Sequence, residues 1–226
     1  AAGLITLAGD TTLNALAGTL TLTGGLDLGA NDLIFSGGDF EINGTTSGTG
    51  DIAKTGTGSL SRIGSAWSLP GALTVSGGTF SANGQAVTAA GLVLVNGGIY
   101  QSGSGNQTFN GGLEITSGTF AGGSGQLDVN GDLLLSGGAM SAASGNLSIS
   151  GDFVITGSPA FTNAGGTVIF DGIQNQTFTS GGQSFHHVSL QNAGTASQNI
   201  LTLTDDLDIN GNLVIQDGLL DLASFN

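Results

Sequence analysis

The segment Gly131-Asp132-Leu133-Leu134-Leu135-Ser136-Gly137-Gly138 is one copy of a unit that recurs every 20 residues. The unit opens with a glycine, continues with an apolar run and closes on two glycines. A fixed internal period of this size indicates a repeat architecture, in which one unit is too small to bury its apolar side alone. The opening glycine stands at the same place in the neighbouring units, at Gly71, Gly91, Gly111 and Gly151.

Alignment of the units places similar apolar residues in columns. Residues spaced by two point to the same side of a strand, so each unit predicts about three short strands with one apolar side. The first column holds Leu73, Val93, Leu113, Leu133 and Phe153, and the second, two residues further on, holds Val75, Val95, Ile115, Leu135 and Ile155. A third alternating pair comes late in the unit, as Leu127/Val129, Leu147/Ile149 and Leu207/Ile209.

Two further positions extend the register beyond these units. We expect the glycine position to form a corner that needs positive φ or a close backbone approach, and the apolar position to form an interior stack. The glycines are Gly18, Gly38, Gly58, Gly78, Gly98, Gly118 and Gly138, with Gly218 near the end. The stack comprises Leu20, Phe40, Leu60, Phe80, Tyr100, Phe120 and Met140.

The frame is less regular toward the C-terminus. From about 158 to 200 the 20-residue register is less regular, and Val188 and Leu190 are displaced from it by one residue. Gly211, Leu213 and Ile215 fit the register again. We therefore predict one domain over 1–226, with regular coils over 11–157, less regular coils over 158–205, and regular coils again over 206–226.

Short strands with glycine corners bury their apolar sides when the chain coils and each coil stacks on the last. The sequence predicts an all-β fold, a right-handed single-chain parallel β-helix (β-solenoid) with about 20 residues per coil and roughly eleven coils. An antiparallel meander is the alternative, because Asn110-Gly111, Asn130-Gly131 and Asn210-Gly211 are hairpin signals. The strict period favours stacked coils, since a meander has no need of it.

The composition narrows the classes of function. Only Lys54 and Arg62 are basic, against 16 acidic residues, and the formal net charge is −14. Binding to nucleic acid or to anionic lipid depends on basic residues, so we expect neither as a partner. We also expect no membrane insertion, because no run approaches the apolar length needed to span a bilayer. The chain has no cysteine, so disulfides do not hold the fold.

One stretch carries a resemblance to a known family. Residues 48–60, Gly-Thr-Gly-Asp-Ile-Ala-Lys-Thr-Gly-Thr-Gly-Ser-Leu, followed by Gly-Gly-Thr-Phe at 77–80, resemble the autotransporter-associated β-strand repeat. Gln176-Thr177-Phe178 with Gly181-Gly182, and the run 207–213, look like repeats of very large bacterial secreted proteins. The resemblance implies a β-helical passenger or adhesin on, or released from, a bacterial surface. It brings no shared catalytic residues.

The sequence contains few candidate catalytic residues. Glycoside hydrolysis uses paired carboxylates, and Asp205, Asp206 and Asp208 form the only acidic cluster. The chain lacks the Gly-His-Gly and Arg-x-Lys elements of polygalacturonases, and Lys54 and Arg62 are far in sequence from Asp205. We expect no enzyme, no catalytic residue and no cofactor, with Asp205 and Asp206 in a solvated turn.

Other candidate sites also favour structural roles. His186 and His187 are strand neighbours that we expect to point to opposite faces, so they would not share a metal ion. Residues 122–128 resemble a Ca²⁺-binding nonapeptide only weakly, because Leu127 and Asp128 stand in the wrong order. We expect Trp67, just before Pro70, to fill a corner.

Residues between the first two columns are predicted to point outward. Thr74, Leu94, Glu114, Leu134 and Val154 hold these positions, and their irregularity argues against the flat threonine array of an ice-binding face. Leu94, Leu134 and Val154 instead predict an exposed apolar contact face.

The ends of the chain suggest a function. A strand is expected at Leu4–Leu7, the last unit starts at Gly211, and neither end shows a capping helix or a charged cap. An uncovered coil is a free strand edge, and two such ends that pair head to tail form a filament. We therefore expect a non-catalytic extracellular structural protein that self-associates head to tail. The alternatives are a passenger fragment of a bacterial adhesin and a polysaccharide-active β-helix enzyme. The adhesin would bind glycans or host and matrix surfaces, with the irregular region near Gln174-Asn175-Gln176 as the place of contact.

Overall fold

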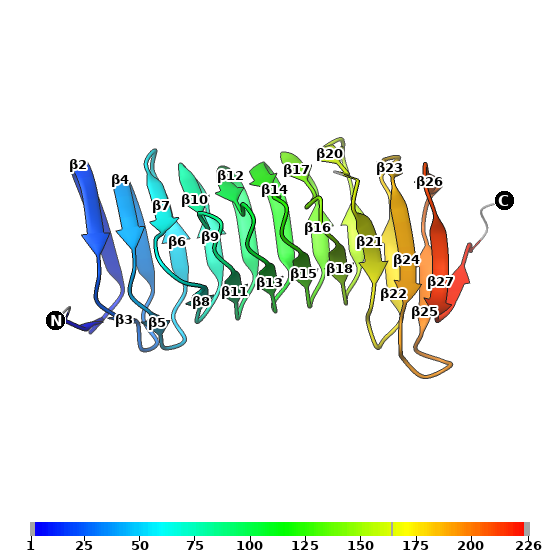
Figure 1. Ribbon diagram of the computed structural model, residues 1–226, viewed down its shortest axis with the longest axis horizontal. Helices are drawn as coiled ribbons and strands as arrows, with labels where there is room; N and C mark the ends of the chain where they lie inside the picture. Colours follow the sequence, from blue (N-terminus) through cyan, green and yellow to red (C-terminus); the bar gives the residue numbers. More distant parts are fainter. Residues whose placement is uncertain (1–2, 164, 224–226) are drawn as a thin grey trace.

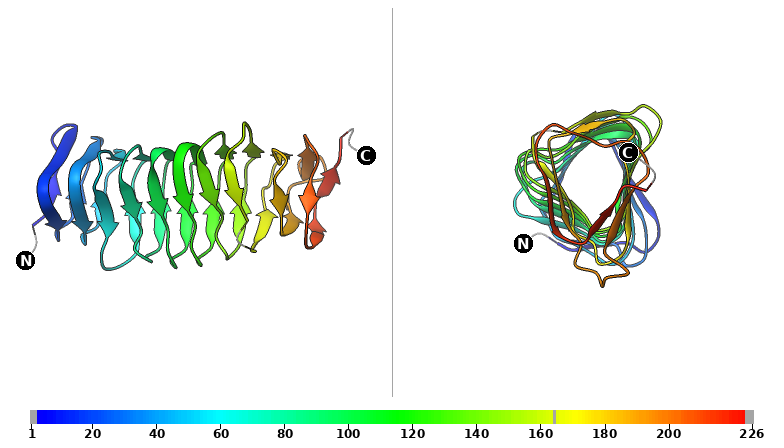
Figure 2. Two further views of the ribbon diagram at one scale, coloured as in Figure 1. Left: turned by 90° about the horizontal axis from the view of Figure 1, so that it is seen from above. Right: turned by 90° about the vertical axis from the view of Figure 1, so that its right-hand side faces the viewer.

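The computed structural model describes residues 3–163 and 165–223, which form a β-solenoid of about 11 turns (Figure 1). The described residues contain strands, turns and bends and no helix, and successive coils pair in parallel about 20 residues apart. The predicted parallel β-solenoid is confirmed. Viewed along its axis, the coils superimpose in one closed outline, and the blue and red coils lie at opposite ends of the rod (Figure 2).

Three faces make up each regular coil, and each face is a ladder of parallel strands. The first face comprises the N-terminal parts of β2 (Thr11–Leu22), β4 (Leu33–Ile42), β12 (Val93–Gln101) and β14 (Leu113–Ala121), together with β6 (Ile52–Lys54), β9 (Leu73–Val75), β16 (Leu133–Leu135), β19 (Phe153–Ile155), β22 (Gln176–Thr179), β25 (Ile200–Leu203) and β28 (Leu219–Asp221). The second face comprises the C-terminal parts of β2, β4, β12 and β14 with β7 (Ser59–Arg62), β10 (Thr79–Ser81), β17 (Ala139–Ser141) and β20 (Ala160–Thr162).

The third face is a separate eight-stranded sheet. It comprises β8 (Trp67–Leu69), β11 (Val87–Ala89), β13 (Gln107–Phe109), β15 (Leu127–Val129), β18 (Leu147–Ile149), β21 (Thr167–Phe170), β24 (His187–Gln191) and β27 (Leu213–Asp217). Short ladders complete the two ends: β1 (Ile5–Thr6), β3 (Leu26–Asp27) and β5 (Thr46–Ser47) at one end, and β23 (Ser184–Phe185) with β26 (Asp208–Ile209) at the other.

The interior stack lies in one pile along the second face. Phe40 pairs with Leu60, Leu60 with Phe80, and the ladder continues through Tyr100 and Phe120 to Met140. All six are at most 1% exposed, and the rings of Tyr100 stack at 4.9 Å on Phe80 and 5.0 Å on Phe120. Leu20 pairs with Phe40 but is 39% exposed, so its predicted burial is wrong. Because β2 is an edge strand paired only with β4, one side of Leu20 is uncovered.

The glycine corners need glycine for two different reasons. Gly118 has a φ of 76°, and Gly18, Gly78, Gly138 and Gly218 are also positive. Gly58 lies outside that region of φ, but a Cβ there would stand 2.1 Å from the carbonyl oxygen of Gly38 in the coil before. Close stacking of backbones thus excludes a side chain at Gly58, and Gly38 and Gly98 are similarly crowded.

The prediction that the 20-residue register resumes after residue 205 is wrong. Leu213 and Ile215 pair with Val188 and Leu190 on the third face, and they do not join the first-face column of Leu133 and Leu135. Phe153 pairs with Phe178 and Phe178 with Leu203, so two successive steps along the first face are 25 residues long. The additional residues place Leu213 and Ile215 on a different face, although they are a multiple of 20 residues from Leu133 and Leu135. The same shift places Gly218 between β27 and β28, at another corner than Gly138.

Buried amides hold the longer coils at the corner before the first face. Gln176 points inward, and its Nε2 donates to the carbonyls of Ile149 (2.9 Å) and Gly151 (2.7 Å). Asn192, fully buried, donates to Gln176 Oε1 at 3.1 Å and accepts from the Gly194 N–H at 3.0 Å. These bonds satisfy the backbone of a wider turn, so residues 171–175 and 192–199 add length without breaking the ladders.

Candidate functional site

The acidic cluster near residue 205 joins two coils. Asp205 accepts the backbone N–H of Ser180 on Oδ1 and that of Gly181 on Oδ2, both at 2.7 Å. The carboxylate of Asp208 accepts the Ser184 hydroxyl at 2.5 Å. The expectation of a solvated turn is therefore wrong for Asp205, which is half-buried. Its carboxylate satisfies two backbone donors, an arrangement that stabilises the fold.

Both basic side chains point into the interior, which was not predicted. Lys54 lies between Phe35 and Val75 in the first-face ladder and has no exposed surface. Its ammonium donates to the carbonyl of Thr55. Burial lowers the pKa of Lys54, and the charge of Asp39 opposes this in part. The alternation Ile52-x-Lys54 was the signal in the sequence, because it puts Lys54 on the apolar side of its strand.

Arg62 is 1% exposed and binds backbone carbonyls. Its guanidinium donates to the carbonyls of Ser65 (2.8 Å) and Gly44 (2.5 Å), and it lies 5.8 Å from the ring centroid of Trp67. Burial lowers the pKa of Arg62. Since Lys54 and Arg62 are the only Lys and Arg in the sequence, the outer surface presents no Lys or Arg side chain to a ligand.

Trp67 belongs to the core. It is 1% exposed, stacks on Phe80 at 5.3 Å, and donates from Nε1 to Thr46 Oγ1 at 3.2 Å. A side chain so covered cannot stack on a sugar from outside. Trp67 does not fill a corner as expected, because it is the first residue of β8 on the third face and its side chain is in the core.

The two histidines are closer than the sequence suggested. Their ring centroids lie 4.1 Å apart, so the expectation that they point to opposite faces is wrong. The cause is a bend at His186, between β23 and β24, which leaves only His187 in a regular strand. Nδ1 of His187 accepts the backbone N–H of Asn212 at 2.9 Å. In residues 3–163 and 165–223 no group of three or more His, Asp or Glu side chains could hold a metal ion.

Asp128, in the segment compared with a Ca²⁺-binding loop, points outward from β15. Leu127 beside it is buried, as their order in the sequence required. Partial burial and the negative charge of Asp171 raise the pKa of the Asp128 carboxyl.

The predicted apolar contact face is a single ladder on the first face. Leu94 pairs with Glu114, Glu114 with Leu134, and Leu134 with Val154. Each of these side chains is half-buried by its neighbours. Glu114 interrupts the apolar row, so the exposed apolar area here is smaller than the three residues alone suggest.

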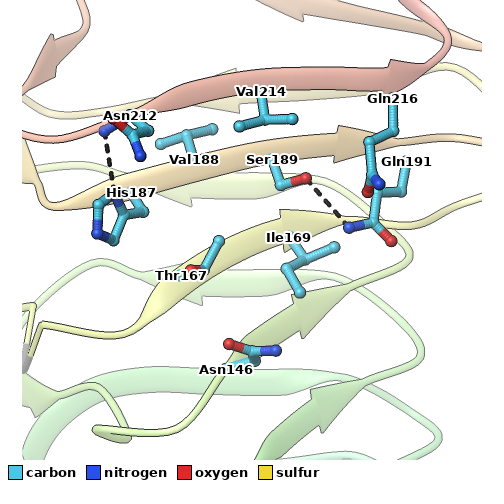
Figure 3. Close-up of a pocket in the computed structure, with 10 residues that line it drawn as sticks. All are labelled: Asn146, Thr167, Ile169, His187, Val188, Ser189, Gln191, Asn212, Val214 and Gln216. Atoms are coloured by element: carbon cyan, nitrogen blue, oxygen red, sulfur yellow. Dashed lines mark hydrogen bonds between the residues drawn. The ribbon is translucent and has the colours of Figure 1, made fainter.

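A groove of about 430 Å³ lies over the third face near the C-terminal end (Figure 3). Thr167, His187 and Asn212 border one side, and Gln191 and Gln216 the other (Figure 3). Its lining contains no carboxylate. The polar loop expected near 174–176 contributes Gln174 and Asn175 to the surface, whereas Gln176 is buried.

Large apolar side chains are exposed at both ends of the rod. At the N-terminal end Leu16 is 90% exposed, on the free edge strand β2. At the C-terminal end a hollow of about 590 Å³ opens into the interior, and Asp205 and Asp206 lie at it. Its apolar lining comprises Leu203, Leu207, Ile209, Leu213, Leu220 and Leu222.

Comparison of the chain with protein-family models, with curated proteins and with solved structures gave no match. Across residues 3–163 and 165–223, no helix has the length and apolar character required to cross a bilayer.

Proposed function

We propose that the chain is a non-catalytic structural protein, displayed on or released from a bacterial surface, whose solenoids stack head to tail into a filament. The extracellular location rests on the resemblance of residues 48–60 to the autotransporter-associated repeat. The stacking rests on the distribution of exposed apolar side chains over the rod.

That distribution is strongly uneven. Among the described residues eleven large apolar side chains are exposed, and nine of them lie on the terminal coils. They are Leu4, Ile5, Leu16 and Leu20 at one end and Leu213, Val214, Ile215, Leu219 and Leu222 at the other. Exposed apolar side chains gathered at the two ends suit an interaction surface, and two different ends that meet form a contact that does not close on itself.

The free strand edges support the same contact. β2 has one neighbour on its sheet, as do β27 and β28 at the other end. Unpaired N–H and C=O groups on an edge strand are templates for another strand. A second copy would continue the parallel ladders and cover the C-terminal hollow. The contact is apolar and backbone-mediated, since both cations are inside.

Sedimentation velocity and negative-stain imaging of the purified chain over a range of concentrations test the proposal. We expect linear particles that lengthen with concentration. Leu16→Asp and Leu213→Asp, one at each end, should shift the population to single rods. Ile99→Asp is the matched control, because Ile99 is 43% exposed, close to the 45% of Leu213, but lies in the middle of the rod. Single wild-type rods at high concentration, or equal loss of assembly in the control, would refute end-to-end stacking.

The uncharged groove of Figure 3 favours one second function, binding of a neutral glycan. Thr167, Gln191 and Gln216 offer hydrogen-bond donors and acceptors suited to sugar hydroxyls. A glycan array with wild-type protein and Gln191→Ala tests this function. Binding that the variant loses supports it, and an array without bound glycans rejects it.

A further inference from the structure

One column on the third face repeats a contact between coils. Residues at the start of successive strands, either the first residue or the one before it, lie beside their counterparts in the next coil. The column comprises Asn106, Gln126, Asn146, Thr167, His187 and Asn212. Asn106 Oδ1 accepts the backbone N–H of Gln126 at 3.0 Å. His187 Nδ1 accepts the backbone N–H of Asn212 at 2.9 Å. The imidazole of His187 and the amide oxygen of Asn106 therefore have the same role, which is to accept a backbone N–H of the next coil.

The bond to Asn212 fixes the protonation state of His187. A backbone N–H can only donate, so Nδ1 must carry a lone pair, and the neutral ring then bears its proton on Nε2. Protonation of Nδ1 would set two donors against each other and remove the bond. A metal ion at His187 would compete for the same lone pair, which makes the His186–His187 pair unsuited to ligation while this bond is intact.

The surroundings do not compensate a charged His187. The ring of His186 lies beside it, 4.1 Å away between centroids. Thr167 of β21 pairs with His187, and the groove beside it is lined by uncharged groups, including Asn212 just before β27 and Gln216 within β27. β26 contributes Asp208, whose carboxylate accepts the Ser184 hydroxyl, and β27 ends at Asp217, which pairs with Gln191. A protonated His187 would thus lie beside a second imidazole and a backbone N–H donor, neither of which balances its charge.

The strand that this bond fastens is the least supported on its face. β27 is last in the third-face sheet, pairs only with β24, and has exposed residues along its whole length. Gly211 permits the close approach, because a Cβ there would lie 2.6 Å from Nδ1 of His187. The loss of one bond in such a strand opens it locally, at a free energy well below that of global unfolding.

We propose that His187 is a proton-sensitive latch, which fastens the coil containing β27 to the coil before it at neutral pH and releases it in mild acid. Imidazole is the side chain that ordinarily changes charge between about pH 5 and pH 8, so the latch is tested across this range. The bond lies within a single chain, but a second copy in the proposed filament would also cover β27, so exchange is measured at a protein concentration at which single rods predominate.

Hydrogen exchange of the intact chain at about pH 7.5 and about pH 5 tests the latch, after correction for intrinsic exchange rates. The bond is worth about a factor of ten in the opening equilibrium. We expect protection over β27 to fall about tenfold in the wild type. The peptide over β15 should be unchanged, because the residue before it, Gln126, donates to the Asn106 amide, which does not titrate. His187→Asn keeps an acceptor of the kind found at Asn106 but cannot titrate, so its protection over β27 should be independent of pH.

Three results would overturn the proposal. They are unchanged protection in the wild type, an equal fall in His187→Asn, and a fall that His186→Asn alone abolishes. A measurement on the wild type guards against variants that misfold. Nitrogen shifts of the His187 ring by NMR should show a proton on Nε2 and none on Nδ1 at neutral pH, and a protonated Nδ1 would equally reject the latch.

Discussion

Replacement of Lys54 by methionine should stabilise the protein. Lys54 occupies an interior position between Phe35 and Val75, and its ammonium has one hydrogen-bond acceptor, the carbonyl of Thr55. Removing a charge from water costs more than such partial compensation returns, and buried charges replaced by apolar groups of similar volume are often neutral or stabilising by up to several kcal/mol. Methionine has a similar length and flexibility.

The magnitude is set by opposing effects. Relief from desolvation favours Lys54→Met, whereas the Thr55 carbonyl loses its donor, which costs about 1 kcal/mol. Asp39 is exposed, so the loss of its attraction to Lys54 matters little. We expect a net gain of about 1 kcal/mol in the free energy of unfolding near neutral pH.

The pH dependence of this gain is the decisive observation. Burial lowers the pKa of Lys54 in the folded state, so the folded protein binds fewer protons than the unfolded chain between the lowered value and the ordinary one. Wild-type stability should therefore rise with pH through that interval, toward about 10.5. Lys54→Met lacks this term, so its advantage should be greatest below the lowered pKa and should shrink as pH rises.

Guanidinium titration followed by the fluorescence of the single, buried Trp67 measures both quantities. Lys54→Arg, which keeps the charge, is the control and should give no gain. Burial also raises the pKa of Tyr100 well above its usual range, but this is common to all three proteins and cancels in the differences. A loss of stability in Lys54→Met that does not vary with pH would show that the ammonium is well compensated, and would refute the reasoning.

Three further predictions follow from the same geometry. Trypsin cleaves only after Lys54 and Arg62, both buried, so cleavage should be slow without denaturant and should track unfolding in urea; rapid native cleavage would contradict their burial. Gly58→Ala should cost about 2–3 kcal/mol in a melting experiment because its Cβ would meet the Gly38 carbonyl, whereas Gly9→Ala, with open space around it, should cost little. Hydrogen bonds from Ser59 hold the pKa of Asp39 below its usual range. The ionised Asp39 carboxylate therefore stabilises the fold above about pH 4, and this stabilisation is lost as pH falls through the lowered pKa. In Asp39→Asn, the free energy of unfolding should lack this part of its dependence on acid pH.

The sequence was sufficient for the regular part of the fold because identical positions in successive coils have identical surroundings. Phe80, Tyr100 and Phe120 each pair with the residue 20 positions away, so one column reports one environment. For the same reason the strict period favoured stacked coils over an antiparallel meander. The predicted burial of Leu20 was wrong because the period shows which residue lies next to it in one coil, but not whether a further coil covers its other side.

Counting failed where the coil length changed. Leu213 and Ile215 share the spacing of Leu133 but lie on the third face, because the steps from Phe153 to Phe178 and on to Leu203 are each longer than 20 residues. The amides that hold the wider turns, Gln176 and Asn192, look like ordinary surface residues in the sequence. Their burial depends on backbone carbonyls supplied by residues 149–151 and 174.

The candidate surfaces were predictable only in part. The closeness of His186 and His187 depends on a bend between β23 and β24 that no sequence pattern predicted. Lys54 and Arg62 could have been placed inside from alternation with Ile52 and Leu60. The usual preference of charged residues for water argued the other way, and the corner carbonyls that accept Arg62 have no signature of their own.

The two enlarged turns also show where this molecule tolerates foreign sequence. Residues 171–175 and 192–199 lengthen the corner before the first face, and the orange loop stands outside the common outline in the end view of Figure 2. Strand registry on either side is kept. Peptides grafted at the same corner of other coils would project at regular intervals of roughly 4.8 Å along one line, a spacing suited to a ruler-like display scaffold.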